Sequence, residues 1–217
     1  MLSSPGLKNL AAFLDGRFLV QDEAAQLVGM MAAPDQGDRV LDACAAPGGK
    51  ATHLAELMGY RGSVVALDSD AGRLNRVSEN STRLGTTIVR PVVGDAAIYR
   101  EALFDKILVD APCSGLGVLR RHPDGRWTKG EKLVAERQAV QRRILENCAA
   151  LLKPGGALVY GAGRTEREGN GDLIHAFVAS RRGEFRIDDP RPYLPPPASP
   201  LVGPEGFFRT FPDEPSL

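Results

Sequence analysis

The chain has 217 residues, of which 43% are hydrophobic, and its formal net charge is zero. This composition favours one sizeable α/β domain, and the balanced charge excludes binding of nucleic acid through a global positive field. Three cysteines without a C-x-x-C pair argue against a disulfide framework or a structural zinc site. With no signal peptide and no apolar run near 18 residues, we expect a cytoplasmic protein without metal or membrane partners, of undetermined oligomeric state.

Residues 1–20 form a lead-in with few structural signals, and residues 21–217 are expected to form the domain. Hydrophobic periodicity predicts, in chain order, helix 21–33, a strand ending at 41, a helix from about 50, strand 63–68, a helix to 84, strands 86–93 and 106–110, a helix ending before 154, strand 157–160, helix 172–180, and strands near 185 and at 206–211. Seven prolines between residues 190 and 204 predict an extended surface segment. The alternation of strands and helices predicts a doubly wound sheet.

The stretch from Val40 to Lys50 predicts a strand, a tight turn of small residues and a helix start. Free N–H groups at such a helix start attract an anionic or polar ligand group, and Gly48 and Gly49 would let a ligand approach the backbone. The dinucleotide fingerprint is absent. A P-loop match fails at Cys44 and at Ala51, which disfavours a nucleotide-phosphate enzyme. An ordinary tight turn is the alternative.

Acidic residues follow three predicted strands beside this turn. Asp68 ends the second strand about twenty residues past the turn, where a ribose diol would be held. A ribose site without a phosphate grip suggests S-adenosylmethionine. Asp95 and Asp110 lie at or just past two further strand ends, so the three acids would form a polar rim. The alternative for each acid alone is a helix cap.

Cys113 follows an Asp-Ala-Pro run at the mouth of the proposed site, and Arg120 and Arg121 would favour its thiolate. Arg126 and Trp127 extend this basic cluster. Basic side chains with an aromatic residue suit a phosphate backbone and an exposed base, so the cluster predicts local RNA binding. The alternatives are a small loop residue at position 113 and a solvated loop around it.

Together these residues resemble the RsmB-like (Sun/Fmu) family of S-adenosylmethionine-dependent RNA cytosine-C5 methyltransferases over nearly the whole chain. The resemblance rests on Val20 to Ala24, Asp42 to Lys50, Asp68 with Arg73, Gly94 to Ala96, Asp110 to Gly115, Arg120 to Asp124 with Trp127, and Gly206 to Phe208. It implies a Rossmann-like class I methyltransferase fold with a seven-stranded, mostly parallel sheet and helices on both faces. It also implies an RNA substrate, with ribosomal RNA expected, and a cofactor site made of Cys44, Ala45, Ala46, Pro47, Gly48, Gly49, Lys50, Asp68, Arg73, Asp95 and Asp110.

In this family a cysteine thiolate adds to carbon 6 of an unstacked cytosine, which makes carbon 5 nucleophilic toward the cofactor's methyl group. Members carry one cysteine in a Pro-Cys loop, usually assigned to product release, and a nucleophile in a Thr-Cys pair. Cys113 matches the first position, whereas the Thr-Cys pair reads Ala162 and Gly163 here. Glycine cannot attack.

Two functions therefore stay open. The chain is either an RNA cytosine methyltransferase that uses Cys113, as DNA cytosine methyltransferases use a Pro-Cys cysteine, or a non-catalytic relative that binds RNA or the cofactor.

Overall fold

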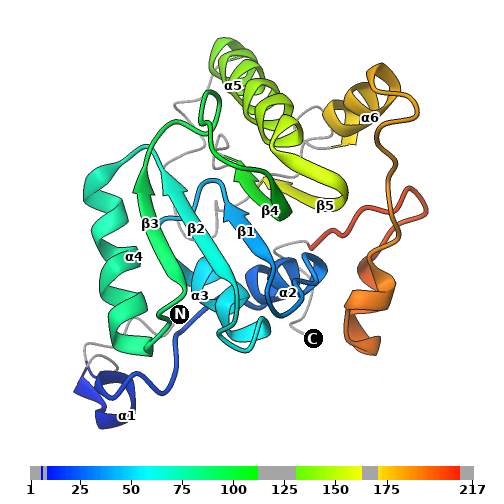
Figure 1. The fold of residues 1–217 in the computed structure, drawn as a ribbon. Coiled ribbons are helices and arrows are strands. Elements are labelled where there is room, and N and C mark those ends of the chain that lie inside the picture. Colours follow the sequence, from blue (N-terminus) through cyan, green and yellow to red (C-terminus); the bar gives the residue numbers. More distant parts are fainter. Residues whose placement is uncertain (1–5, 7–8, 112–130, 163–170, 211–217) are drawn as a thin grey trace.

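A parallel five-stranded sheet forms the centre of the computed structural model, which describes residues 6, 9–111, 131–162 and 171–210 (Figure 1). The strands are β1 (Arg39–Asp42), β2 (Ser63–Asp68), β3 (Val89–Val93), β4 (Phe104–Ala111) and β5 (Leu152–Ala162). They lie in the order β3-β2-β1-β4-β5, and each neighbouring pair is parallel. The expected α/β, Rossmann-like class is therefore confirmed.

Helices cover both faces of this sheet. The helices are α1 (Ala11–Leu14), α2 (Glu23–Met31), α3 (Gly49–Leu57), α4 (Ala71–Leu84), α5 (Glu131–Ala150) and α6 (Gly171–Ser180), and two 3₁₀ helices follow, η5 (Arg191–Tyr193) and η6 (Pro196–Leu201). Side chains of α3 and α4 share one core cluster with the sheet, and side chains of α5 share another. No helix in the described ranges is long and apolar enough to span a bilayer.

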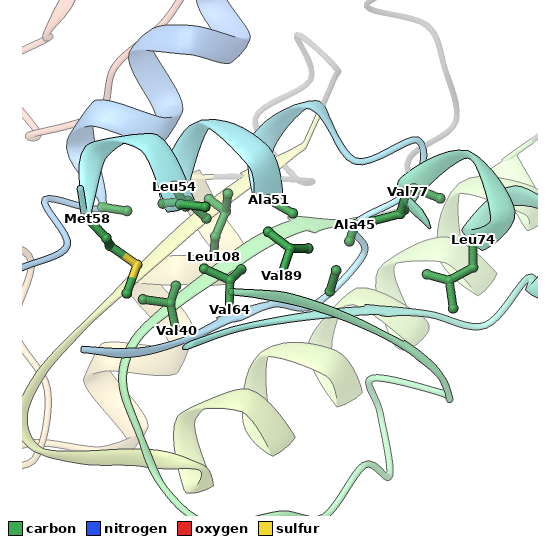
Figure 2. Packing of buried hydrophobic residues seen from close by; sticks show 14 residues of the cluster. Val40, Ala45, Ala51, Leu54, Met58, Val64, Leu74, Val77, Val89 and Leu108 are labelled. Atoms are coloured by element: carbon green, nitrogen blue, oxygen red, sulfur yellow. The ribbon is translucent and has the colours of Figure 1, made fainter. Parts of the chain in front are cut away.

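The strands are apolar on both faces because each face has its own helix layer. Val40, Val64 and Leu108 point toward α3, where they meet Leu54 and Met58 (Figure 2). Their immediate neighbours along each strand point the other way and pack with α5: Leu41, Val65, Ile107 and Val109 lie in the second cluster with Ile144 and Cys148. Because every neighbouring pair of strands is parallel, the carboxyl ends of the strands lie at one edge of this packed sheet.

Local signals explain several helix limits. Asp22 caps α2, because its carboxylate accepts a hydrogen bond from the Ala24 N–H at 3.1 Å. Asp70 caps α4 in the same way, accepting from the Arg73 N–H at 2.9 Å. Gly85 ends α4 with φ at +69°, a left-handed conformation that glycine adopts without strain. The end of α4 agrees with the sequence prediction, whereas α2 is two residues shorter at each end than the predicted helix 21–33.

The lead-in is fixed to the domain through the end of α4. The Arg83 guanidinium donates to the carbonyls of Phe13 and Phe18 at 2.7 and 3.1 Å and stacks 3.8 Å from the Phe13 ring centre. Gly16 has φ at +71°, and a Cβ there would lie 1.7 Å from the Arg83 carbonyl oxygen. A side chain at position 16 would therefore displace this segment.

Three sequence predictions about the sheet need correction. The described part of the sheet has five strands rather than seven, and residues around Phe185 form no strand. Residues 206–210 contribute only an isolated bridge between Val202 and Phe208, and residue 211 lies outside the described ranges. Backbone pairing depends on which neighbours are in reach, and short apolar runs do not reveal this.

The proline-rich segment also differs from its prediction. Proline residues lie at the starts of η5 and η6. The fixed φ of proline suits a 3₁₀ turn. Between the prolines, the apolar side chains of Leu194, Ala198 and Val202 are buried with Leu27 of α2 in a third core cluster. The segment thus forms 3₁₀ turns anchored to the domain by three buried side chains, rather than the predicted extended surface segment.

Candidate functional site

The chain reverses its winding direction between β1 and β4, which are neighbours although two strands separate them in sequence. In open parallel sheets, ligands bind at such a switch point, outside the carboxyl ends of the strands. The turn after β1 and Asp110 near the end of β4 both lie there. The predicted location of the site thus coincides with the place where the topology favours a ligand.

Gly48 shapes the turn between β1 and α3. Its φ is +102°, and a Cβ there would lie 3.0 Å from the Val77 Cα and 3.1 Å from the Val77 Cγ1. The glycine is required by its backbone conformation and by the close approach of α4. A Cβ on Gly49 would have only ordinary contacts, from 3.5 Å, with Leu19 and Gln21. The expectation that both glycines serve ligand approach therefore does not explain Gly48.

One face of α4 holds the turn in place. The Arg73 guanidinium donates to the Ala46 carbonyl at 2.8 Å, and the Asn80 amide donates to the Pro47 carbonyl at 3.1 Å. Val77, between them on the same face, contacts Gly48. Residues spaced by four and three positions along a helix share a face, so three successive turn residues meet one stripe of side chains. Arg73 thus lies beside the turn, as predicted.

Asp68 holds the turn from the other side. Its side chain is 5% exposed, and its two oxygens accept hydrogen bonds from the N–H groups of Ala46 and Asp70, both at 3.0 Å. The Arg73 guanidinium lies 3.9 Å from the same carboxylate. Asp68 therefore builds the turn, and each oxygen keeps one further lone pair for a ligand hydroxyl. The sequence analysis predicted Asp68 as a partner for a ribose diol, and it did not predict that Asp68 also holds the turn together.

Lys50 and Asp110 form an ion pair across the switch point. The Lys50 Nζ lies 2.7 Å from the Asp110 carboxylate, with the side chains 20% and 41% exposed. Burial alone would lower the pKa of Lys50, but the charge and hydrogen bond of Asp110 raise it overall. The pair connects the first turn of α3 with the end of β4, and it presents a cation and an anion side by side at the partly open edge.

Asp42 lies beneath this pair and is fully buried. Neither of its carboxylate oxygens has a hydrogen-bond partner within the described residues. Burial raises the pKa of Asp42 to about 7, and the charge of Lys50 and the nearby Cys44 N–H oppose that rise. A buried carboxyl group with a raised pKa thus lies directly before the turn.

Two further predicted residues lie at the rim and in the turn. Asp95 is exposed just past β3, and its carboxylate accepts a hydrogen bond from the Ala97 N–H at 2.8 Å, which closes a local turn. Cys44 is partly buried, and burial with the Asp42 charge raises the pKa of its thiol. Burial therefore disfavours the thiolate form of Cys44.

The remaining predicted residues lie outside the described ranges: Cys113, Arg120, Arg121, Arg126, Trp127 and Gly163. The structure does fix where the segments that carry them leave the sheet. Ala111 at the end of β4 pairs in register with Ala162 at the end of β5. Neighbouring strands are about 4.8 Å apart, so both segments start side by side next to Asp110.

The sequence analysis missed Asp42 and Asn80 as contributors to the site. Asp42 stood within the recognised motif, but its complete burial depends on how three strands and the turn pack around it. Asn80 could have been found from its spacing of seven residues from Arg73 on one helix face, had the turn been known to lie against that face.

The fold is that of a Rossmann-like protein, with a candidate ligand site at the switch point. The chain belongs to the 16S rRNA methyltransferase RsmB/F family, whose model matches residues 29–190. The predicted family resemblance is therefore confirmed. Within the described part of the chain, no group of three or more His, Cys, Asp or Glu side chains is placed to hold a metal ion.

Two curated relatives are ribosomal RNA small subunit methyltransferases B. A probable one from Bacillus subtilis (strain 168) is 44% identical over 170 residues, which are 76% of this chain and 38% of the relative. One from Shewanella oneidensis is 42% identical over 193 residues, which are 87% of this chain and 44% of the relative. This chain therefore spans less than half the length of these relatives.

Solved structures share the fold. The structure of NSun6 from Pyrococcus horikoshii with SFG is similar with a TM-score of 0.74 and 32% identity. The similarity covers 82% of this chain and 46% of that chain.

Proposed function

We propose that this chain binds S-adenosylmethionine at the turn after β1 and transfers its methyl group to carbon 5 of a cytosine in RNA, with ribosomal RNA as the substrate class. The observation that carries the proposal is the cluster of Asp42, Lys50, Asp68 and Asp110 around a rigid turn at the switch point of the sheet. Membership of the RsmB/F family supports the reaction class.

The described residues fit this cofactor. The first turn of α3 presents backbone N–H groups, which favour an anionic or polar group such as a carboxylate. Asp68 keeps lone pairs for a ribose diol, and the exposed Asp95 is a neighbouring acceptor for an amino group. Asp110 is an acceptor for an ammonium group, and Asp42 lies beneath it as a buried carboxyl without a hydrogen bond. When bound, the cofactor supplies an electrophilic methyl group.

The chain's own residues would supply positioning and a thiol. The pair of Lys50 and Asp110 offers one donor and one acceptor at the edge where the base must enter. The segment that carries Cys113 begins immediately after Asp110, so its thiol is the candidate nucleophile toward carbon 6. Desolvation of a closed site would strengthen each of these interactions.

The non-catalytic alternative keeps one specific observation in its favour. The family's nucleophile position is occupied by Gly163, and glycine offers no side chain to the substrate. Because Ala162 and Ala111 pair in register, the segments of Gly163 and Cys113 start one strand spacing apart. A thiol from the neighbouring segment would therefore approach the base along a different line, and reaction rates depend steeply on that line.

One experiment separates these functions. The unaltered chain is incubated with methyl-labelled S-adenosylmethionine and bulk ribosomal RNA, and the nucleosides are then analysed. We expect labelled 5-methylcytidine, and Cys113→Ser should abolish it because a hydroxyl is far less ionised than a thiol. If only Gly163→Cys, alone or with Ala162→Thr, gives the product, the unaltered chain is the non-catalytic relative.

RNA containing 5-fluorocytosine identifies the attacking residue directly, because it traps the covalent adduct. An adduct mapped to Cys113 supports the active form. Absence of both adduct and methylated cytosine, on RNA shown to be bound, refutes it.

RNA binding is expected to be local and sensitive to salt. Replacing Arg120, Arg121 and Arg126 with Ala should weaken RNA binding and flatten its salt dependence, since each phosphate contact releases counterions. Arg181→Asn is a suitable control, because the Arg181 side chain, just past the end of α6, already pairs with Glu184 at 3.4 Å. Equal affinity and slope in the triple variant would locate RNA binding elsewhere.

A further inference from the structure

Asp42 places a fully buried carboxyl group at the end of β1 without a hydrogen bond to any described residue. An ionised carboxylate buried without a partner costs several kcal/mol. The group must therefore keep a proton or receive a cation. Since the strand pairs on both sides, with β2 and with β4, the backbone fixes the position of this carboxyl group.

The charged and titratable groups that face Asp42 come from four directions. Lys50 comes from α3, Asp110 from β4, Asp68 from β2 and Cys44 from the turn. Lys50 is the cation of this set, and its ammonium already pairs with Asp110 at 2.7 Å. Burial raises the pKa of Asp42 to about 7, so below neutral pH the carboxyl group mostly holds a proton while Lys50 stays on Asp110.

We propose that Asp42 is a second docking position for the ammonium of Lys50, which moves from Asp110 to Asp42 when the ammonium of a ligand arrives at Asp110. Lys50 has a flexible stem and a compact charge, which suit such a move. The short turn after β1 connects the two residues, with Asp42 at the end of β1 and Lys50 in the first turn of α3. Asp42 is thus a positioning residue that frees Asp110. This inference rests on the proposed function, because S-adenosylmethionine is the ligand that brings the ammonium.

The charges balance in this exchange. Before binding, Asp42 is a neutral acid and the Lys50 cation neutralises the Asp110 anion. After binding, the ligand ammonium neutralises Asp110, and Lys50 neutralises an ionised Asp42. The O–H bond of the Asp42 carboxyl group breaks, and its proton leaves to the buffer. Ligand binding should therefore release a proton in proportion to the fraction of Asp42 that was protonated.

Calorimetry of S-adenosylmethionine binding to the full chain measures this release. Titrations at about pH 6.5 in two buffers of different ionisation enthalpy give the number of protons exchanged. We expect release of most of one proton at this pH, where the ligand's own amino group is already an ammonium before binding. 5′-Methylthioadenosine, which carries the nucleoside but no ammonium, should bind without proton release, because Lys50 then stays on Asp110.

Variants assign the proton and the moving cation. Asp42→Asn should bind without proton release and about tenfold more weakly at pH 8, because a neutral amide does not attract Lys50 as a carboxylate does. Lys50→Met should also lose the release. Asp105→Asn is the matched control, since this carboxylate pairs with Lys153 at 2.7 Å near the opposite end of β4. Its proton release should equal that of the unaltered chain.

The outcomes distinguish the two proposals. Failure of S-adenosylmethionine to bind at any pH overturns the proposed function together with this inference. Binding without proton release at pH 6.5, or equal release with 5′-methylthioadenosine, overturns this inference alone. Release that persists in Lys50→Met means that the ligand ammonium reaches Asp42 itself, which also overturns the transfer of Lys50. The comparison of the two ligands uses the unaltered chain and so holds even if Asp42→Asn does not fold.

Discussion

Replacing Asp68 with alanine should loosen the turn that forms the site. The carboxylate accepts hydrogen bonds from the Ala46 and Asp70 N–H groups, both at 3.0 Å, and its side chain is 5% exposed. Alanine removes both acceptors at once. The Ala46 N–H is buried and loses its partner, whereas the Asp70 N–H lies near the surface, where water replaces the carboxylate.

The magnitude follows from these two contacts. A hydrogen bond to a charged group contributes about 1.5–3 kcal/mol, and an unsatisfied buried donor costs about 1–3 kcal/mol. The contact with Arg73 at 3.9 Å adds little, since the Arg73 side chain is more than half exposed. The Ala46 N–H therefore accounts for most of the effect, and we expect the free energy of unfolding to fall by about 2–4 kcal/mol.

Urea denaturation followed by circular dichroism measures this loss, and calorimetry measures S-adenosylmethionine affinity in the same variant. Asp95→Ala is the control, because Asp95 is exposed and accepts one hydrogen bond, from the Ala97 N–H. Its cost should stay below about 1 kcal/mol. If Asp68→Ala lowers the free energy of unfolding no more than Asp95→Ala does, Asp68 does not have this structural role in the turn.

Three other substitutions each change one residue, and urea denaturation measures their effect on the free energy of unfolding. Burial raises the pKa of Asp42 to about 7 from an unfolded value near 3.8, so the stability of the unaltered chain falls as pH rises between these values. The variant Asp42→Asn should therefore be more stable than the unaltered chain between about pH 5 and 8, by a few kcal/mol at most. A stability gain that does not change with pH would contradict this. Gly48→Ala should cost about 2–3 kcal/mol through its left-handed backbone and the Val77 contact, and Gly49→Ala, the control, should cost much less. Burial lowers the pKa of His53, so stability should drop as pH falls through about 6.5, and a variant His53→Gln with an equal drop would refute this.

Much of the fold could be predicted because its local signals and its packing agree. The prediction for β2 coincides with its observed limits, since a run buried on both faces ends at a polar residue beside the turn. Gly85 likewise marked the end of α4, whereas α2 begins later than predicted because Asp22 is its cap and not part of its first turn. The proline-rich segment was harder, because the burial of Leu194 and Ala198 depends on the distant helix α2.

The site was predictable in its location but not in its internal contacts. Strand ends and the turn indicated where the acids gather, because parallel strands bring their carboxyl ends to one edge. The separate roles of Asp42, Asp68 and Asp110 depend on depth within that edge: Asp42 is fully buried, Asp68 is 5% exposed, and the Asp110 side chain is 41% exposed. Sequence spacing carries no information on such depth.

The stripe of Arg73, Val77 and Asn80 along α4 has a consequence for how the site opens. Each of these residues contacts a different member of three successive turn residues, so the turn cannot separate from the sheet without breaking its contacts with the helix. Local opening of the turn and detachment of α4 should then be one cooperative event rather than two. Amide protons of the turn, such as that of Ala46, should therefore exchange with deuterium at the rate at which α4 detaches from the sheet. Substitutions in α4 at positions distant from the turn should also change the exchange rates in the turn.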